Sequence, residues 1–177
     1  METTCEITLM FDCIIGIDPG VSNGGIVAKT KNTVELSKNP RKLSDMITLL
    51  NGIKEYSRSP MAVIEHISLY SGDLSVPGKI YGLQKLFNHY TLLTQAVSYL
   101  EIPYLDVFPA TWQKGLNLKV KHYESNKERK NRYKRVAQSY FPGVKVTLWN
   151  SDALLLAMFG MKALTLHKEW VSKKLQY

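Results

Sequence analysis

The chain has 177 residues, a length typical of one domain that buries a proper hydrophobic core. Its formal net charge of +8 favours a polyanionic partner, although charge does not indicate a fold. Cys5 and Cys13 match neither a zinc-ligand spacing nor a disulfide framework, which predicts an intracellular, reducing compartment. We expect no secretory signal and no membrane partner, because no apolar run approaches the roughly 20 residues of a membrane span.

The first third of the chain contains strand, turn and helix signals. Turn signals at 23–25 and 31–32 separate three expected short strands, namely Ile14–Asp18, Gly25–Lys29 and Thr33–Leu36. Apolar residues then recur at helical spacing from Leu43 to about Tyr56, which predicts an amphipathic helix. Met61–Glu65 is nearly all apolar, as expected of a strand that lies centrally in a sheet.

Helices dominate the rest of the chain. The expected elements are a surface loop at His66–Lys79, a long helix at Ile80–Leu100, a strand at Tyr104–Val107 and a final helix at Asp152–Leu166. Residues 114–124 are polar and basic, and Ser125 with Glu128 forms a capping box for a helix that ends near Tyr140. This order predicts an α/β fold with a five-stranded mixed sheet flanked by helices, in a single domain spanning 1–177.

Three acidic residues occur where folding can bring them together. Asp18 ends an apolar strand before Pro19-Gly20, Glu65 ends a second apolar strand, and Asp152 lies in the first turn of an apolar helix. Taken singly, an Asp before Pro-Gly is usually a turn residue, and an Asp in a first helical turn usually serves the helix dipole. Together, two strand ends and a helix start predict a divalent-metal nuclease site.

Phosphodiester hydrolysis gives these carboxylates a chemical purpose. Two Mg²⁺ ions about 4 Å apart can activate a water and stabilise the charge on phosphorus and on the leaving oxygen. Mg²⁺ prefers a few carboxylates together with water and phosphate oxygens. Asp18, Glu65 and Asp152 are therefore the expected metal ligands and catalytic residues, with Asp18 bridging both ions. Three glycines are expected to let a DNA backbone approach closely, namely Gly20, Gly24 and Gly25.

The ordered motifs at 15–20 (Ile-Gly-Ile-Asp-Pro-Gly), 63–65 (Val-Ile-Glu) and 152–157 (Asp-Ala-Leu-Leu-Leu-Ala) are similar to those of a known family. The chain resembles the RuvC family of Holliday-junction resolvases, which have an RNase H-like fold. Further segments resemble the phage and plastid branch of that family, and these are 109–114, 137–142 and 157–160. The resemblance covers roughly residues 13 to 162.

The resemblance implies a homodimeric, Mg²⁺-dependent endonuclease that cuts two opposed strands of a four-way DNA junction symmetrically. Asp18, Glu65 and Asp152 match the family's first, second and last acidic positions. Lys114 and Lys130 fall near the two lysines that the family places beside the scissile phosphate, so both are expected to be catalytic. The expected location is a bacterial or phage-infected cytoplasm, with an organelle as the alternative.

One family position departs from the pattern. The family usually carries another Asp or His three or four residues before the final acid, and this chain has Trp149 and Leu148 there. Asn150 or Ser151 is expected to substitute weakly through an oxygen. Mn²⁺ should replace Mg²⁺ with a gain in activity, because Mn²⁺ tolerates irregular ligand sets. If a full ligand set exists, the acids to examine are Asp73 and Asp106.

A basic stretch from Lys114 to Arg135 is opposed only by Glu124 and Glu128. A charge run is usually a solvated helix face, but a one-signed excess between two active-site elements favours phosphate contacts. Tyr70 is expected to stack on an unpaired base. The other expected DNA-binding residues are Lys119, Lys121, Lys127, Arg129 and Arg132.

Some alternatives remain open. The helix from Tyr81 to Tyr99 forms the dimer interface if the family's assembly holds, or its apolar stripe covers the sheet. Without a fourth acid, the chain could be a junction-binding protein with a weakened metal site. The same fold and acids suit an RNase H acting on RNA–DNA hybrids. A kinase-like ATPase also begins with Gly-Ile-Asp-x-Gly, but this chain is too short for two such lobes and lacks a second Gly-rich phosphate loop.

Overall fold

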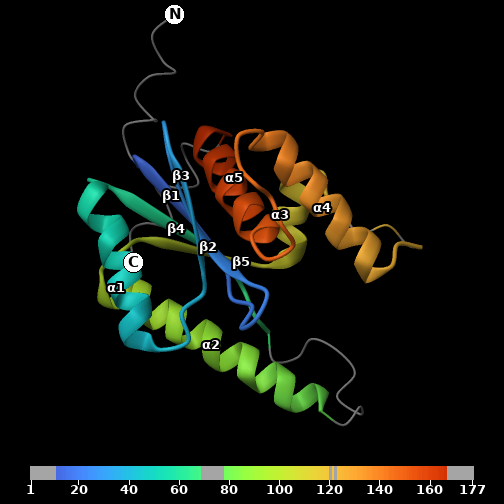
Figure 1. Ribbon diagram of the computed structural model, residues 1–177, viewed down its shortest axis with the longest axis horizontal. Coiled ribbons are helices and arrows are strands. Elements are labelled where there is room, and N and C mark those ends of the chain that lie inside the picture. Colours follow the sequence, from blue (N-terminus) through green and yellow to red (C-terminus); the bar gives the residue numbers. More distant parts are fainter. Residues whose placement is uncertain (1–10, 69–77, 120, 122, 167–177) are drawn as a thin grey trace, which may run out of the picture.

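The computed structural model describes residues 11–68, 78–119, 121 and 123–166 (Figure 1). The strands are β1 (Cys13–Asp18), β2 (Gly25–Thr30), β3 (Val34–Lys38), β4 (Pro60–Glu65) and β5 (Tyr104–Val107). The helices are α1 (Leu43–Tyr56), α2 (Lys79–Tyr99), α3 (Pro109–Gly115), α4 (Asn126–Tyr140) and α5 (Ser151–Leu166). No helix in these residues is long and apolar enough to cross a membrane.

The strands form one mixed sheet in the order β3-β2-β1-β4-β5, which confirms the predicted α/β fold. β1 pairs antiparallel with β2 and parallel with β4, and β4 pairs parallel with β5. The central strand is therefore β1, and β4 lies beside it. The register pairs Ile17 with Ile64, so the next residues along the two strands, Asp18 and Glu65, lie at the same edge of the sheet.

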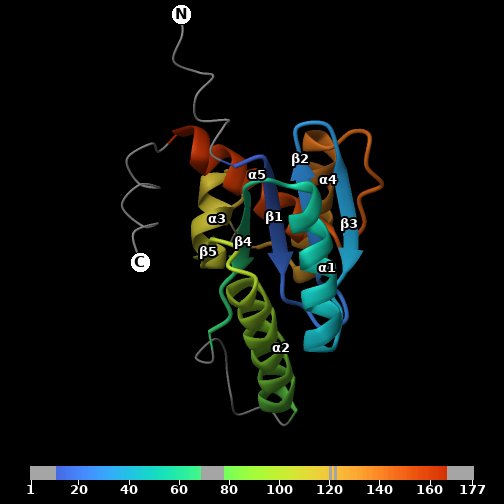
Figure 2. The same cartoon turned by 90° about the vertical axis from the view of Figure 1, so that its left-hand side faces the viewer.

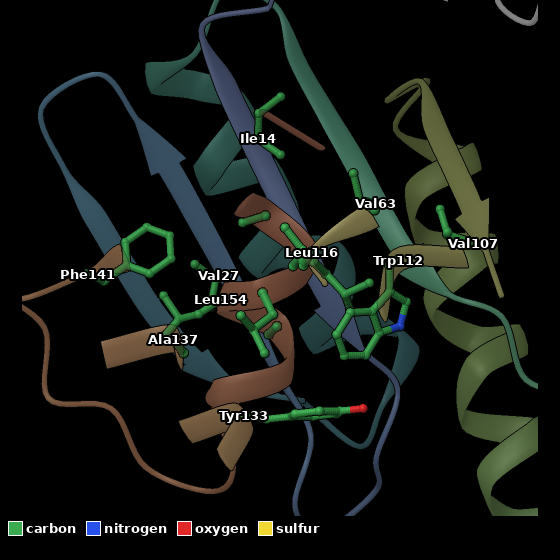
Figure 3. Close-up of a cluster of buried hydrophobic side chains, with 14 of the residues drawn as sticks. Ile14, Val27, Val63, Val107, Trp112, Leu116, Tyr133, Ala137, Phe141 and Leu154 are labelled. Atoms are coloured by element: carbon green, nitrogen blue, oxygen red, sulfur yellow. The ribbon is translucent and has the colours of Figure 1, made fainter. Parts of the chain in front are cut away.

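Helices cover both faces of the sheet. Figures 1 and 2 show α3, α4 and α5 on one face and α1 and α2 on the other, with α2 extending beyond the strand ends. Side chains alternate between the faces, as the period of two in a strand requires. Ile14 and Val63 pack with α3–α5 (Figure 3), whereas Ile15, Ala62 and Ile64 pack with α1 and α2.

The helix α5 packs unusually close to β1. A Cβ on Gly16 would lie 2.0 Å from the carbonyl oxygen of Ala153 and 2.7 Å from the amide nitrogen of Ala157. A Cβ on Gly160, one turn further along, would lie 2.7 Å from a methyl group of Val63. Backbone therefore lies directly against backbone, which fixes how far the start of α5 stands from the end of β1.

Most expected elements occur within one or two residues of their predicted bounds. The capping box at the start of α4 is confirmed, since the side chains of Ser125 and Glu128 each bond the other's backbone N–H. The helix α3 was not predicted. It has seven residues, too few for a periodic pattern, and it is defined by Pro109 in its first turn and by the buried ring of Trp112.

The close contact at Gly16 yields a stability prediction. Gly16→Ala should lower the free energy of unfolding by about 1–3 kcal/mol or more, because the added methyl overlaps the α5 backbone. Gly52→Ala is the matched control. Gly52 lies within α1 in open space, where an added Cβ would meet no other atom, so alanine there should raise stability by roughly 0.5–1 kcal/mol. Urea unfolding of both variants measures the difference, and equal effects would contradict the packing described.

Candidate active site

Three carboxylates come from three elements on one side of the sheet. Asp18 ends β1, Glu65 ends β4 and Asp152 lies in the first turn of α5. Asp18 continues the alternation of Ile14 and Gly16, so it faces α5, as Glu65 does. The close packing of α5 on β1 then brings Asp152 to the same edge.

Each carboxylate is held by one neighbouring donor. The backbone N–H of Gly20 donates to Oδ1 of Asp18 at 3.1 Å, within the turn that follows β1. The indole N–H of Trp112 donates to Oε1 of Glu65 at 3.2 Å, from α3. The hydroxyl of Ser151 donates to Oδ1 of Asp152 at 3.0 Å. Each bond uses one carboxylate oxygen and orients the group.

The acids share one electrostatic environment. Burial raises the pKa of Asp18 well above its usual range, and the negative charges of Glu65 and Asp152 raise it further. Burial, with a contribution from Asp152, raises the pKa of Glu65 to about 7. Burial also raises the pKa of Asp152. Carboxyl groups that raise one another's pKa in this way lie near enough to interact electrostatically.

Two basic residues of α4 oppose that effect. Lys130 lowers the pKa of all three carboxyl groups, and Arg129 lowers that of Glu65 and Asp152. The part of the predicted basic stretch that carries Arg129 and Lys130 therefore lies near the acids. Lys114 is exposed in the last turn of α3, the same helix whose Trp112 holds Glu65. Catalytic roles for the two lysines remain predictions.

The chemistry of these side chains fits a hard divalent cation. All three supply carboxylate oxygens, and a cation between them would relieve their mutual repulsion. As they stand, however, the described residues contain no group of three or more His, Cys, Asp or Glu arranged to hold a metal ion. Metal binding would therefore require the carboxylates to turn toward a common centre.

The position of the absent fourth acid is filled by an aromatic ring. The ring of Trp149 lies against Gly25, where a Cβ would come within 2.9 Å of it, and Gly25 pairs with Asp18 across the β1–β2 ladder. Leu148 is 47% exposed. The amide oxygen of Asn150, which we expected to substitute weakly for the fourth acid, accepts the N–H of Thr147 at 2.7 Å within its own loop. Ser151 instead bonds Asp152.

Asp106 lies away from the three acids. It belongs to the opposite face of the sheet, because Val107 and Leu105 pack on the α5 face. Its Oδ2 accepts the hydroxyl of Tyr90 at 2.7 Å and lies 2.7 Å from Nδ1 of His66. Asp106 is therefore not the missing ligand. Asp73 and Tyr70 lie outside the described residues.

The turn glycines serve the packing of the chain itself. A Cβ on Gly24 would come within 2.3 Å of the carbonyl oxygen of Asp18, and one on Gly20 would come within 2.8 Å of the amide nitrogen of Gly24. Gly25 packs on Trp149. The chain's own packing therefore requires these glycines, and the close approach of a DNA backbone to them remains a prediction.

The basic segment divides into free and engaged side chains. The guanidinium of Arg132 donates two bonds of 2.6 Å to Glu124 and a third to the carbonyl of Lys119, so it ties the preceding loop to α4. Its predicted contact with DNA would compete with this pair. Among the expected DNA-binding residues, the lysines are exposed, namely Lys119, Lys121 and Lys127.

Some residues near the site were given no role from the sequence. Trp112 binds Glu65, and Asn39 and His89 bind the turn that carries Asp18. The sequence signals for the first were a tryptophan within a polar segment and the resemblance of segment 109–114, and neither indicated a contact with Glu65. The other two are far from Asp18 in the chain, so no local pattern indicated them.

Comparisons with known proteins place the fold. No family model and no curated protein sequence matches the chain. Among solved structures, RuvC of Thermus thermophilus in complex with Holliday junction substrate matches with a TM-score of 0.52 and 13% identity, covering 88% of this chain and 96% of that one. A second structure of Thermus thermophilus RuvC gives a TM-score of 0.53 at 13% identity, covering 88% and 97%. The chain therefore has the RuvC-like, RNase H-like fold.

The raised pKa of Glu65 predicts how stability depends on pH. In the metal-free protein, folded Glu65 retains its proton up to about pH 7, whereas the unfolded side chain loses it near 4.5. The folded state binds more protons in this window, so stability should fall as pH rises through it. Glu65→Gln should flatten the fall and raise Tm at neutral pH by about 3 °C per 1 kcal/mol of repulsion removed.

Thermal unfolding of metal-free protein from about pH 5 to about pH 8 tests this expectation. Glu55→Gln is the control, because Glu55 is exposed on α1, in the other helical layer. An unchanged slope in Glu65→Gln, matching Glu55→Gln, would show that Glu65 does not carry the effect.

Proposed function

We propose that this protein is a Holliday-junction resolvase, a metal-dependent endonuclease that makes symmetric nicks in opposed strands of four-way DNA junctions. The observation that carries the proposal is the convergence of Asp18, Glu65 and Asp152 at one sheet edge, on a fold similar to that of RuvC. One of the similar structures is a complex with Holliday junction substrate, which supports junction DNA as the partner. Segments 109–114 and 137–142 support the phage and plastid branch.

The proposed metal ligands are Asp18, Glu65 and Asp152. Two Mg²⁺ ions, or Mn²⁺ in their place, would supply an activated water and stabilise the leaving oxygen. The chain's own contribution is orientation and charge. Trp112 holds one oxygen of Glu65, and the backbone N–H of Gly20 holds one oxygen of Asp18. Each bond restrains one oxygen of its carboxylate and leaves the other oxygen to turn toward a metal ion.

The basic stretch is the proposed path for the DNA backbone. Lys130 is close enough to the acids to lower their pKa, so it is placed to attract the reacting phosphate. Lys114 belongs to α3, beside Glu65. Lysines further along the stretch would position DNA without reading its sequence, and these are Lys119, Lys121 and Lys127.

Symmetric cutting requires two active sites related by a two-fold axis, and closed dimers are the commonest oligomer. We therefore propose a homodimer. The face of α2 that the sheet does not cover supports it as the interface, since Ile80 is 49% exposed and Tyr81 is 62% exposed. The buried positions of α2 are confined to its second half, at His89 and beyond.

A second candidate is a junction-binding protein with weak or no cleavage. Trp149 in place of the fourth acid favours it, because the second metal would have fewer protein ligands. Metal-dependent cleavage of a synthetic junction separates the two. An RNase H activity would instead be shown by preferred cleavage of an RNA–DNA hybrid in competition with the junction.

Asp18→Asn should separate binding from catalysis. The change removes a metal ligand but no phosphate contact, so cleavage of a four-way junction in Mg²⁺ should fall by about 1000-fold or more while junction affinity stays within about twofold. Gel assays of binding and cleavage measure both. Asp45→Asn, the same change on the exposed start of α1, should leave both intact. Near wild-type cleavage by Asp18→Asn would remove Asp18 from the mechanism.

The lysines should fall into two classes. Lys130→Ala and Lys114→Ala should slow cleavage by roughly 100-fold with a smaller effect on binding, since each acts at the reacting phosphate. Lys119→Ala and Lys121→Ala should lower the slope of log K against log salt by up to about 0.9 each. Lys31→Ala, just beyond the end of β2 that lies away from the acids, is the charge-matched control. Equal losses in both assays for all four would indicate a general electrostatic surface.

A further inference from the structure

Two side chains from outside the turn hold the last residue of β1 and the two residues that follow it. The amide nitrogen of Asn39 donates to the carbonyl oxygen of Asp18 at 2.6 Å and to that of Gly20 at 3.0 Å. Nδ1 of His89, on α2, lies 2.7 Å from the carbonyl oxygen of Pro19. Three successive carbonyl groups, beginning with that of Asp18 itself, are thus bound by side chains remote in sequence.

His89 makes a second bond of the same kind. Its Nε2 lies 2.9 Å from the carbonyl oxygen of Pro40, and the side chain is buried. Backbone carbonyls only accept hydrogen bonds, and a neutral imidazole carries one N–H. Both bonds can form together only if His89 carries a proton on each ring nitrogen. His89 would then act as an imidazolium that fastens the turn at Pro19 to the segment at Pro40.

Asn39 serves at this position through its donor nitrogen. Within the described residues, its Oδ1 is buried and has no hydrogen-bond partner. A buried oxygen without a donor is unfavourable, and native structures retain few of them. The two hydrogen bonds from the amide nitrogen to the Asp18 turn offset the unfavourable burial of this oxygen.

The turn transmits this restraint to the carboxylate. The carbonyl of Gly20, which Asn39 binds, also accepts the N–H of Gly24 at 3.0 Å. The N–H of the same Gly20 donates to Oδ1 of Asp18. Holding Gly20 through both its N–H and its carbonyl therefore restrains Oδ1 of the Asp18 carboxylate.

We propose that Asn39 and His89 are positioning residues for Asp18, with His89 acting as a doubly donating imidazolium. Together they hold the turn in place, so that the Asp18 carboxylate stays at the sheet edge shared with Glu65 and Asp152 before a metal ion arrives. The proposal rests on the proposed role of Asp18 as a metal ligand. Neither side chain is expected to touch the metal or the DNA.

Mn²⁺ binding, followed by electron paramagnetic resonance without DNA, is the first test. His89→Phe keeps a ring of similar size without donors, and Asn39→Ala removes the two bonds to the turn. Each should weaken Mn²⁺ binding roughly 10- to 100-fold, as loss of an outer-shell partner typically does. His89→Gln, whose amide nitrogen carries two N–H groups, should restore part of the loss. Asn88→Ala, at the neighbouring position of α2, is the control.

Asn39→Asp provides the sharper comparison. It keeps the shape of the side chain but points a carboxylate oxygen at two carbonyl oxygens, so it should weaken Mn²⁺ binding more than Asn39→Ala does. Variants whose melting temperature falls while Mn²⁺ affinity stays at the wild-type value would overturn the proposal. A wild-type protein that binds no Mn²⁺ would instead contradict the proposed function, so the two failures are distinguishable.

Nitrogen NMR of the wild-type protein tests the state of His89 independently of any variant's folding. With ¹⁵N-labelled imidazoles at neutral pH, both ring nitrogens of His89 should carry protons, and the pair of signals should be absent from His89→Gln. A ring with one protonated nitrogen would overturn the imidazolium clamp.

Discussion

The approach of α5 to β1 at Gly16 is the constraint on which the site depends. With 2.0 Å between a hypothetical Cβ and the carbonyl of Ala153, any side chain at this position would push the helix off the sheet. Asp152 immediately precedes Ala153, so such a shift would carry its carboxylate away from Asp18. The same strand also sets the position of Glu65, through the parallel pairing of β1 with β4.

Bringing three acids together has an electrostatic cost that the fold only partly offsets. Burial and mutual repulsion raise the pKa of Asp18 and Glu65, while Lys130 and the hydrogen bonds from Trp112 and Gly20 act in the other direction. The site is thus most stable when protonated or when a cation neutralises it. A cluster of this kind detracts from the stability of the metal-free protein, which is typical of residues retained for function.

The sequence predicted the sheet, and the position of two acids at one edge of it, because both depend on local patterns. Apolar runs that end in Asp18 and Glu65 specify strand ends, and parallel strands place such ends at one edge. It did not predict α3, which is too short to show a helical period, or the contact of Trp112 with Glu65. It also placed Asp106 among possible ligands, although alternation along β5 puts Asp106 on the other face with Tyr90. The roles of Asn39 and His89 depend on contacts between residues up to 70 positions apart.

Anomalous scattering from crystals soaked in Mn²⁺ tests the central claim most directly. If α5 and the two parallel strands assemble a metal site, anomalous difference density should appear between the carboxylates of Asp18, Glu65 and Asp152. The soaked crystals should also show these side chains turned toward the ion. Density found only elsewhere, for example beside Asp106 and His66 on the opposite face, or no density between the three acids at saturating Mn²⁺, would contradict the account.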